Sequence, residues 1–203
     1  MKEKYNINQT TLRILGLFSS DYRKAIHIRE IARDIQIDVK AVGIQLNRLE
    51  KANVLSSALR GRNKEYQLNL SNPVTIYYII LAEAFASIIY LEKYFLVKKL
   101  TSEIANKIEG TIILFGSFAR GEATEESDID LFVISEKKAD AEAVSEVGRL
   151  MGREINMKST GKKQFLNGLM ENDPLIKEVV SSHIVIKGVD QLVEIMWLYH
   201  GER

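Results

Sequence analysis

The sequence predicts an α/β (α+β) protein with a basic N-terminal helical module, a long connecting helix and a C-terminal small mixed sheet flanked by helices. Three observations support this class. Residues 10–52 have the apolar spacing of helices and precede two short strand patterns. Residues 74–109 contain no glycine or proline, and residues 110–134 hold two short apolar runs typical of buried strands. We therefore expect three segments: 1–70, 71–109 and 110–203.

Composition narrows the class of protein. With 203 residues, of which 46% are hydrophobic, the chain is long enough to bury two small cores. It has no cysteine, which excludes a disulfide scaffold, a thiol nucleophile and a Cys-ligated zinc site and favours a reducing, cytoplasmic location. The polar start MKEKYNINQT does not resemble a signal peptide.

The charge is distributed unevenly along the chain. The net charge is only +1, but residues 1–70 hold 13 Lys and Arg against 7 Asp and Glu, and the remainder holds 15 against 20. A basic module beside an acidic one predicts that the first binds a polyanion and the second binds cations.

The basic segment reads as three helices and a hairpin. Apolar residues repeat at helical spacing over 10–20 and 27–35, and Asp38 is suited to cap a third helix that runs to Ala52. Residues 53–59 and 64–68 read as two strands. A short turn between the second and third helices makes this a helix-turn-helix pattern.

This segment resembles the winged helix-turn-helix modules of transcriptional regulators, which implies binding to double-stranded DNA. By position, Lys40 and Asn47 would face the major groove, and Arg60, Arg62 and Lys64 would lie on the wing against phosphates. Gly43 and Ile44 are weak base readers, so sequence specificity stays open. The alternative is a solvated face used for protein contacts.

The middle segment predicts one long helix, or two with a bend. Asn72-Pro73 is a good helix start, and the stretch that follows is apolar nearly all round. We expect a homodimer interface as well as a domain joint, with burial inside one chain as the equal alternative. The run Val74–Leu91 is long enough for a bilayer, but Glu83 near its centre argues against a membrane span.

The acidic segment contains a strand, a turn and a second strand. The apolar run Thr111–Phe115 ends in Gly116-Ser117, and eleven residues after Ser117 comes the pair Asp128 and Asp130. Alternation along a strand places these two carboxylates on one face. Glycine permits close approach to a phosphate, and magnesium prefers hard oxygen ligands of this kind.

The string LFGSFARGEATEESDIDLFVI resembles the signature of minimal nucleotidyltransferases of the DNA polymerase beta superfamily. The resemblance implies that Gly116 and Ser117 hold the phosphates of a nucleoside triphosphate, with ATP as the default, and that Arg120 assists them. It also implies that Asp128 and Asp130 bind Mg²⁺ and carry catalysis. Active members have a third carboxylate on a neighbouring strand, where this chain has Asn156.

Asn156 weakens the expectation of an active enzyme, because an amide is a poor base for an attacking hydroxyl. Glu154 lies two residues earlier, and we interpret it as a surface residue. We expect a DNA-binding regulator whose nucleotidyltransferase-like domain binds Mg²⁺ and nucleotide, with catalysis weak or lost. One alternative is an active enzyme that moves NMP from NTP to a partner protein or a small acceptor. Another is an interaction scaffold with an inactive site.

The end of the chain predicts further helices and a late strand. Residues 161–170 read as a helix, Asn172-Asp173-Pro174 opens another, residues 183–188 form a strand, and residues 191–199 form a last helix. The three histidines have no metal-ligand spacing.

Overall fold

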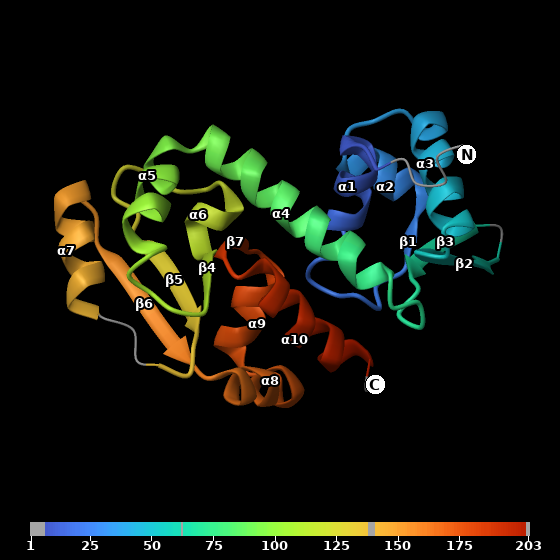
Figure 1. Ribbon diagram of the computed structural model, residues 1–203. Coiled ribbons are helices and arrows are strands. Elements are labelled where there is room, and N and C mark those ends of the chain that lie inside the picture. The colour runs from blue at the N-terminus through green and yellow to red at the C-terminus, as the bar shows by residue number, and fades with distance from the viewer. Residues whose placement is uncertain (1–6, 62, 138–140, 202–203) are drawn as a thin grey trace, which may run out of the picture. The chain divides into compact units, whose positions relative to one another are not determined.

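A computed structural model of the chain describes residues 7–61, 63–137 and 141–201 (Figure 1). The chain divides into two compact units. Unit 1 comprises Met1–Phe85 with His200–Arg203, and unit 2 comprises Ala86–Tyr199. The division falls inside helix α4 (Thr75–Lys93), so the connecting helix belongs partly to each unit.

Unit 1 contains three short helices and a three-stranded antiparallel sheet in the order β1-β3-β2 (Figure 1). Its elements before α4 are α1 (Gln9–Gly16), β1 (Ile26–His27), α2 (Ile28–Asp34), α3 (Val39–Lys51), β2 (Leu55–Arg60) and β3 (Asn63–Leu68). The three predicted helices and the predicted hairpin are therefore confirmed as elements, and β1 is an addition.

Local chemistry explains where α3 begins. The Asp38 carboxylate accepts hydrogen bonds from the backbone amides of Lys40 at 2.9 Å and Ala41 at 3.4 Å, which confirms the predicted N-cap. Val42, Leu46 and Leu49 share the buried face of this helix, as their spacing predicts. The opposite face of α3 is therefore presented to solvent.

Unit 2 is built on a four-stranded mixed sheet in the order β6-β5-β4-β7, in which β5 and β6 are parallel and the other pairs are antiparallel. This confirms the predicted mixed sheet flanked by helices. After the end of α4 its elements are α5 (Phe95–Ile104), β4 (Thr111–Phe115), α6 (Gly116–Arg120), β5 (Ile129–Ile134), α7 (Ala141–Met151), β6 (Ile155–Thr160), α8 (Lys162–Glu171), α9 (Pro174–Ser181), β7 (Ile184–Lys187) and α10 (Val189–Gly201).

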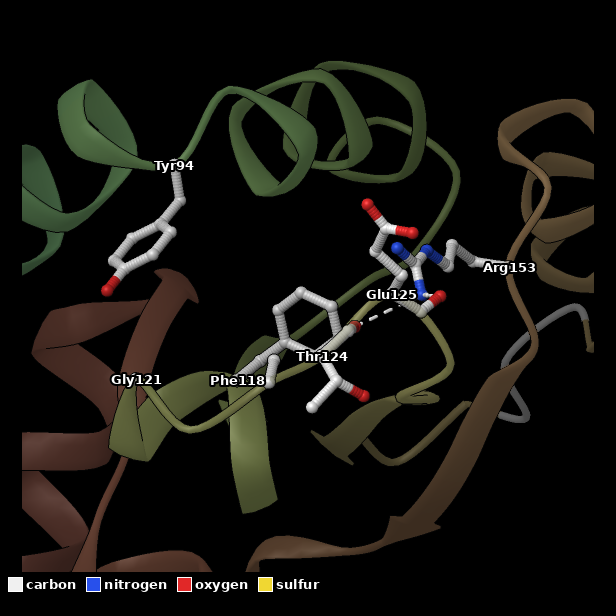
Figure 2. A pocket seen from close by; sticks show the side chains of 7 residues that line it. Tyr94, Phe118, Gly121, Thr124, Glu125 and Arg153 are labelled. Atoms are coloured by element: carbon white, nitrogen blue, oxygen red, sulfur yellow. Dashed lines mark hydrogen bonds between the residues drawn. The ribbon is translucent and has the colours of Figure 1, made fainter.

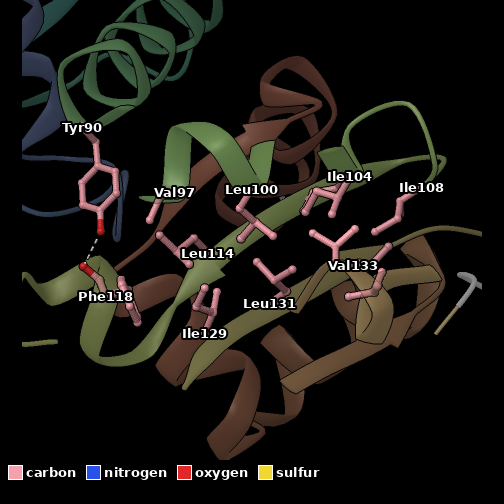
Figure 3. Packing of buried hydrophobic residues seen from close by; sticks show 13 residues of the cluster. Tyr90, Val97, Leu100, Ile104, Ile108, Leu114, Phe118, Ile129, Leu131 and Val133 are labelled. Carbon is pink, nitrogen blue, oxygen red and sulfur yellow. Dashed lines mark hydrogen bonds between the residues drawn. The ribbon is translucent and has the colours of Figure 1, made fainter. Parts of the chain in front are cut away.

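The two faces of this sheet carry different side chains. Ile129, Leu131 and Val133 alternate along β5 onto the face that joins the cluster of α5 and α7 (Figure 3). The intervening Phe132 packs on the other face against Phe115 and the Phe165 ring of α8. Asp130 shares the face of Phe132, so the same alternation that builds the core directs this carboxylate away from it.

The connecting region forms two helices, because the backbone of Tyr94, with φ −113° and ψ 89°, leaves the helical conformation between α4 and α5. α5 ends at Ile104, earlier than the expected end at Glu109. Among the described residues, α4 is the one helix that is long and apolar enough to cross a membrane, and 39% of its most apolar window is buried. Glu83 near its centre is buried, whereas Tyr77 and Ile88 are exposed.

Candidate functional site

The predicted phosphate turn lies where the buried strand β4 ends and α6 begins. Gly116, the first residue of α6, has a φ of +69°, a conformation that strains residues with a side chain. A Cβ atom on Gly116 would overlap the carboxylate of Asp130. Sequence reasoning assigned this glycine to close approach by a ligand, but its nearest neighbour in the structure is Asp130 itself. Gly116 therefore makes room for one of the predicted metal ligands.

Asp128 and Asp130 meet at the amide of Asn156. Asp130 lies directly beside Asn156 in the parallel register of β5 and β6. The Asn156 Nδ2 atom donates to Asp128 Oδ2 and to Asp130 Oδ1, each at 3.4 Å. Both hydrogen bonds are longer than the usual range of about 2.7–3.2 Å, so they hold the amide weakly. The structure thus brings together the three positions that the sequence comparison placed in one site.

The environment of Asp130 favours a cation. Burial raises the pKa of the Asp130 carboxyl, and the nearby carboxylates of Asp128 and Glu178 raise this pKa further, against the opposing effects of Asn156 and Arg120. Burial and neighbouring negative charges disfavour the ionised form of a carboxyl group, and a bound cation favours it. The pair of aspartates is therefore electrostatically suited to hold a metal ion.

The donor set fits Mg²⁺. Two carboxylates supply hard oxygen ligands, and rotation of the Asn156 amide would turn its oxygen in place of its nitrogen toward the same point. Among the described residues, no group of three or more His, Cys, Asp or Glu side chains is arranged to hold a metal. The cluster therefore has two acidic ligands, with the neutral Asn156 at the third position.

Arg120 is held by carboxylates near the turn. Its Nε atom pairs with Glu122 at 2.8 Å, and its Nη1 atom pairs with Glu178 of α9 at 3.6 Å. Ser117 is partly buried in the first turn of α6, beside Gly116. Sequence reasoning missed Glu178, because α9 is distant along the chain and its sequence carries no motif that links it to the turn.

A pocket of about 360 Å³ lies beside the segment that joins α6 to Asp128 (Figure 2). Tyr94 and Phe118 contribute aromatic surface to it, and Arg153 contributes its guanidinium. Arg153 points at the main chain of Thr124 and Glu125, with which it forms hydrogen bonds (Figure 2). Glu154, the alternative third carboxylate, is exposed just before β6, which agrees with its interpretation as a surface residue.

A family model matches the part of the chain that contains these residues. Residues 96–186 match the family model of the nucleotidyltransferase domain. The match begins within α5 and ends within β7, so it includes Gly116, both aspartates and Asn156.

The other comparisons add little to this match. One solved structure, described as "Crystal structure of the toxin-antitoxin with AMP-PNP", is 17% identical over 53% of this chain and 80% of that chain, with a TM-score of 0.34. The comparison with curated proteins finds no match.

The candidate DNA-contacting face lies in unit 1, outside the residues that match the nucleotidyltransferase family model. Lys40 and Asn47 are both exposed on α3, and Ile44 between them is 54% exposed. Gly43 is partly buried and has the Ile28 side chain beside it. These three exposed positions of α3 thus supply a cation, an amide and an apolar side chain, and Arg48 and Lys51 of the same helix are exposed as well.

The hairpin places its cations next to acidic residues. Arg60 Nε lies 3.3 Å from Glu65 Oε2, and Lys64 Nζ lies 2.8 Å from Glu50 Oε2. Glu50 also accepts a hydrogen bond from the Ser57 hydroxyl, which holds its carboxylate beside Lys64. Arg62, the remaining predicted wing residue, lies outside the described residues. The pairing of Lys64 was not foreseen, because Glu50 is 14 residues away in the sequence.

Proposed function

We propose that this protein is a DNA-binding regulator whose nucleotidyltransferase domain binds a magnesium nucleotide and transfers NMP slowly or not at all. The observation that carries the nucleotide part is the convergence of Asp128 and Asp130 on Asn156, next to Gly116, within a domain that matches the nucleotidyltransferase family. The basic unit 1 supports the DNA part.

Each residue of the site has a distinct role in this proposal. Asp128 and Asp130 hold Mg²⁺, which would neutralise phosphate charge and polarise the attacking hydroxyl. The turn at Gly116 and Ser117 receives the phosphates, because the backbone amides at the start of α6 are donors without a partner in the helix. Arg120 adds a positive charge once the phosphates draw it away from Glu122 and Glu178.

Asn156 accounts for weak catalysis. The residue at this position contacts both aspartates, so a carboxylate here would supply a third negative charge to the metal and a base near the acceptor hydroxyl. An amide oxygen can coordinate a metal but accepts a proton poorly. Binding of the magnesium nucleotide can therefore persist where transfer is slow.

Replacement of Asp128 by asparagine tests the nucleotide proposal. Asn has nearly the same shape but removes one of the two charges, so the affinity for the Mg²⁺–ATP complex is expected to fall by about 100-fold. Isothermal titration of the full chain with ATP, with and without Mg²⁺, measures this. Asp190→Asn, at an exposed position on α10, is the matched control and should titrate like the wild type. Magnesium-independent binding of equal strength in all three proteins would contradict the proposal.

An assay of NMP transfer with the same proteins distinguishes weak from robust catalysis. An active nucleotidyltransferase predicts Mg²⁺-dependent incorporation of label from an NTP into a protein or small acceptor, and loss of that incorporation in Asp128→Asn. Incorporation at many turnovers per protein would favour this second function over the regulator. ATP is used first because no residue of the phosphate turn reads a base.

The DNA-binding proposal rests on the arrangement of unit 1. Its chain order of helix, short strand, two helices and hairpin, with a three-stranded sheet in the order β1-β3-β2, supports its interpretation as a winged helix-turn-helix module. α3 is the helix that would enter the major groove with Lys40 and Asn47. The hairpin would approach phosphates with Arg60, Arg62 and Lys64.

The Lys64–Glu50 pair yields a quantitative prediction for this surface. Glu50→Gln releases the Lys64 ammonium and removes one negative charge, so DNA affinity at low salt is expected to rise by about threefold to tenfold. The slope of log K against log salt should also steepen by about one. Fluorescence anisotropy with a labelled duplex over a KCl series measures both quantities. Glu142→Gln, an exposed change on α7, should leave the slope unchanged.

The homodimer stays a prediction. Its support is a set of apolar side chains on α4 that are exposed in the single chain: Tyr77, Leu81, Ile88 and Ile89. A second copy of this chain would remove such side chains from water.

A further inference from the structure

The loop that leads into Asp128 is held by an arginine from the turn before β6. The Arg153 Nη1 atom donates to the carbonyl oxygens of Thr124, at 3.3 Å, and Glu125 (Figure 2). It also donates to the carbonyl oxygen of Ser127 at 3.3 Å. Three carbonyl oxygens of one loop thus converge on a single guanidinium nitrogen. A guanidinium carries hydrogen-bond donors and no acceptor, so carbonyl oxygens are suitable partners for it.

The main chain of Arg153 is fixed independently of the loop. Its amide donates to the Gly148 carbonyl at 3.0 Å, and Gly152 before it has a φ of +65° and donates to the Arg149 carbonyl at 3.2 Å. These two bonds end α7 in the manner of a Schellman motif. The arginine therefore extends from a rigid helix end and does not depend on the loop for its position.

The loop also has internal order. The Ser127 hydroxyl accepts a hydrogen bond from the Thr124 amide at 2.8 Å, and the Ser127 amide donates to the Thr124 carbonyl at 3.3 Å. These two hydrogen bonds hold the turn whose carbonyl oxygens Arg153 contacts. Its last carbonyl, that of Ser127, belongs to the peptide group that begins Asp128.

Two contacts from the neighbouring residues Arg153 and Glu154 hold the backbone on either side of Asp128. Arg153 holds the Ser127 carbonyl on one side, and the Glu154 carbonyl accepts the Ile129 amide at 2.9 Å on the other. Asp128 itself is exposed and precedes β5, so no ladder bond of that strand fixes it. Asp130, by contrast, lies within the strand ladder and against Gly116.

We infer that Arg153 is a positioning residue for metal binding: it orders the 124–127 loop and so places the Asp128 carboxylate opposite Asp130. The inference rests on the proposed function of the aspartate pair. It assigns Arg153 no contact with nucleotide or acceptor. Arg153 acts through Asp128, as the outer residues of metal sites act through the ligands that they orient.

Direct metal binding tests this role. Mn²⁺ affinity of the full chain is measured by electron paramagnetic resonance in the presence of a non-hydrolysable ATP analogue. Arg153→Met keeps much of the side-chain length but has no donor, and its Mn²⁺ affinity is expected to fall about 10-fold to 100-fold. Binding of the analogue in EDTA should stay within about twofold of wild type, because the phosphate turn is not altered. Arg153→Lys should recover part of the loss.

The controls separate a positioning role from a structural one. Arg149→Met removes an exposed arginine of the same helix end and should bind Mn²⁺ like the wild type. If Arg153→Met does not fold, Ser127→Ala loosens the same loop without touching the core and should weaken Mn²⁺ binding by about threefold or more. Wild-type Mn²⁺ affinity in Arg153→Met or in Ser127→Ala overturns the inference. Absence of Mn²⁺–nucleotide binding in the wild type itself overturns the proposed function instead.

Discussion

Gly116→Ala is expected to remove magnesium-nucleotide binding, with a loss of affinity of at least about 100-fold, although Gly116 carries no reactive group. The added methyl group would overlap the Asp130 carboxylate and displace it from Asp128. A displacement on the order of 1 Å is enough for an effect of this size at a preorganised site. Titration of the variant with ATP and Mg²⁺ measures the loss.

Backbone strain at position 116 would also lower the stability of Gly116→Ala, and this effect needs its own control. An alanine at positive φ costs about 1–2 kcal/mol of stability. Gly61→Ala has the same strain, since Gly61 has a φ of +62°, but no atom outside its immediate neighbours lies within 4 Å of the new methyl group. We expect a similar fall in thermal stability from Gly61→Ala and unchanged nucleotide affinity. Nucleotide binding retained by Gly116→Ala would show that the site does not depend on this contact.

Asn156→Asp is expected to have the largest effect in the opposite direction. A third carboxylate would face Asp128 and Asp130 in the register that the parallel strands impose. In the absence of metal the three charges repel one another, so the melting temperature is expected to fall by about 3 °C. Mg²⁺ should reverse this fall. Metal affinity and the rate of label incorporation should each rise by about 10-fold or more.

Asn167→Asp is the matched control for Asn156→Asp. It adds the same charge at an exposed position on α8, within the same domain, and should change neither magnesium affinity nor thermal stability appreciably. Calorimetry and a labelled-NTP assay, run with and without Mg²⁺, compare the two variants. If Asn156→Asp loses stability but gains no metal affinity, Asn156 is not at the third ligand position.

Elements with strong local patterns were predictable from the sequence. The predicted strand Thr111–Phe115 is identical to β4, and Asp38 and Asp173 cap α3 and α9 because short acidic side chains reach free amides at helix starts. Two elements were missed. β1 has only two residues and exists because it pairs with β3, while α7 does carry apolar residues at helical spacing, Val144 and Val147, that could have identified it.

What the sequence determined by itself is the composition of the candidate nucleotide site. Two features of this site are local properties. Glycine at the end of the strand permits a positive φ, and side-chain alternation along the strand directs Asp130 away from the core. Only the tertiary structure decided which distant residues join them. Arg153 and Glu178 reach the site through tertiary packing, as Glu50 reaches Lys64 in unit 1, and local spacing in the sequence does not encode contacts of that kind.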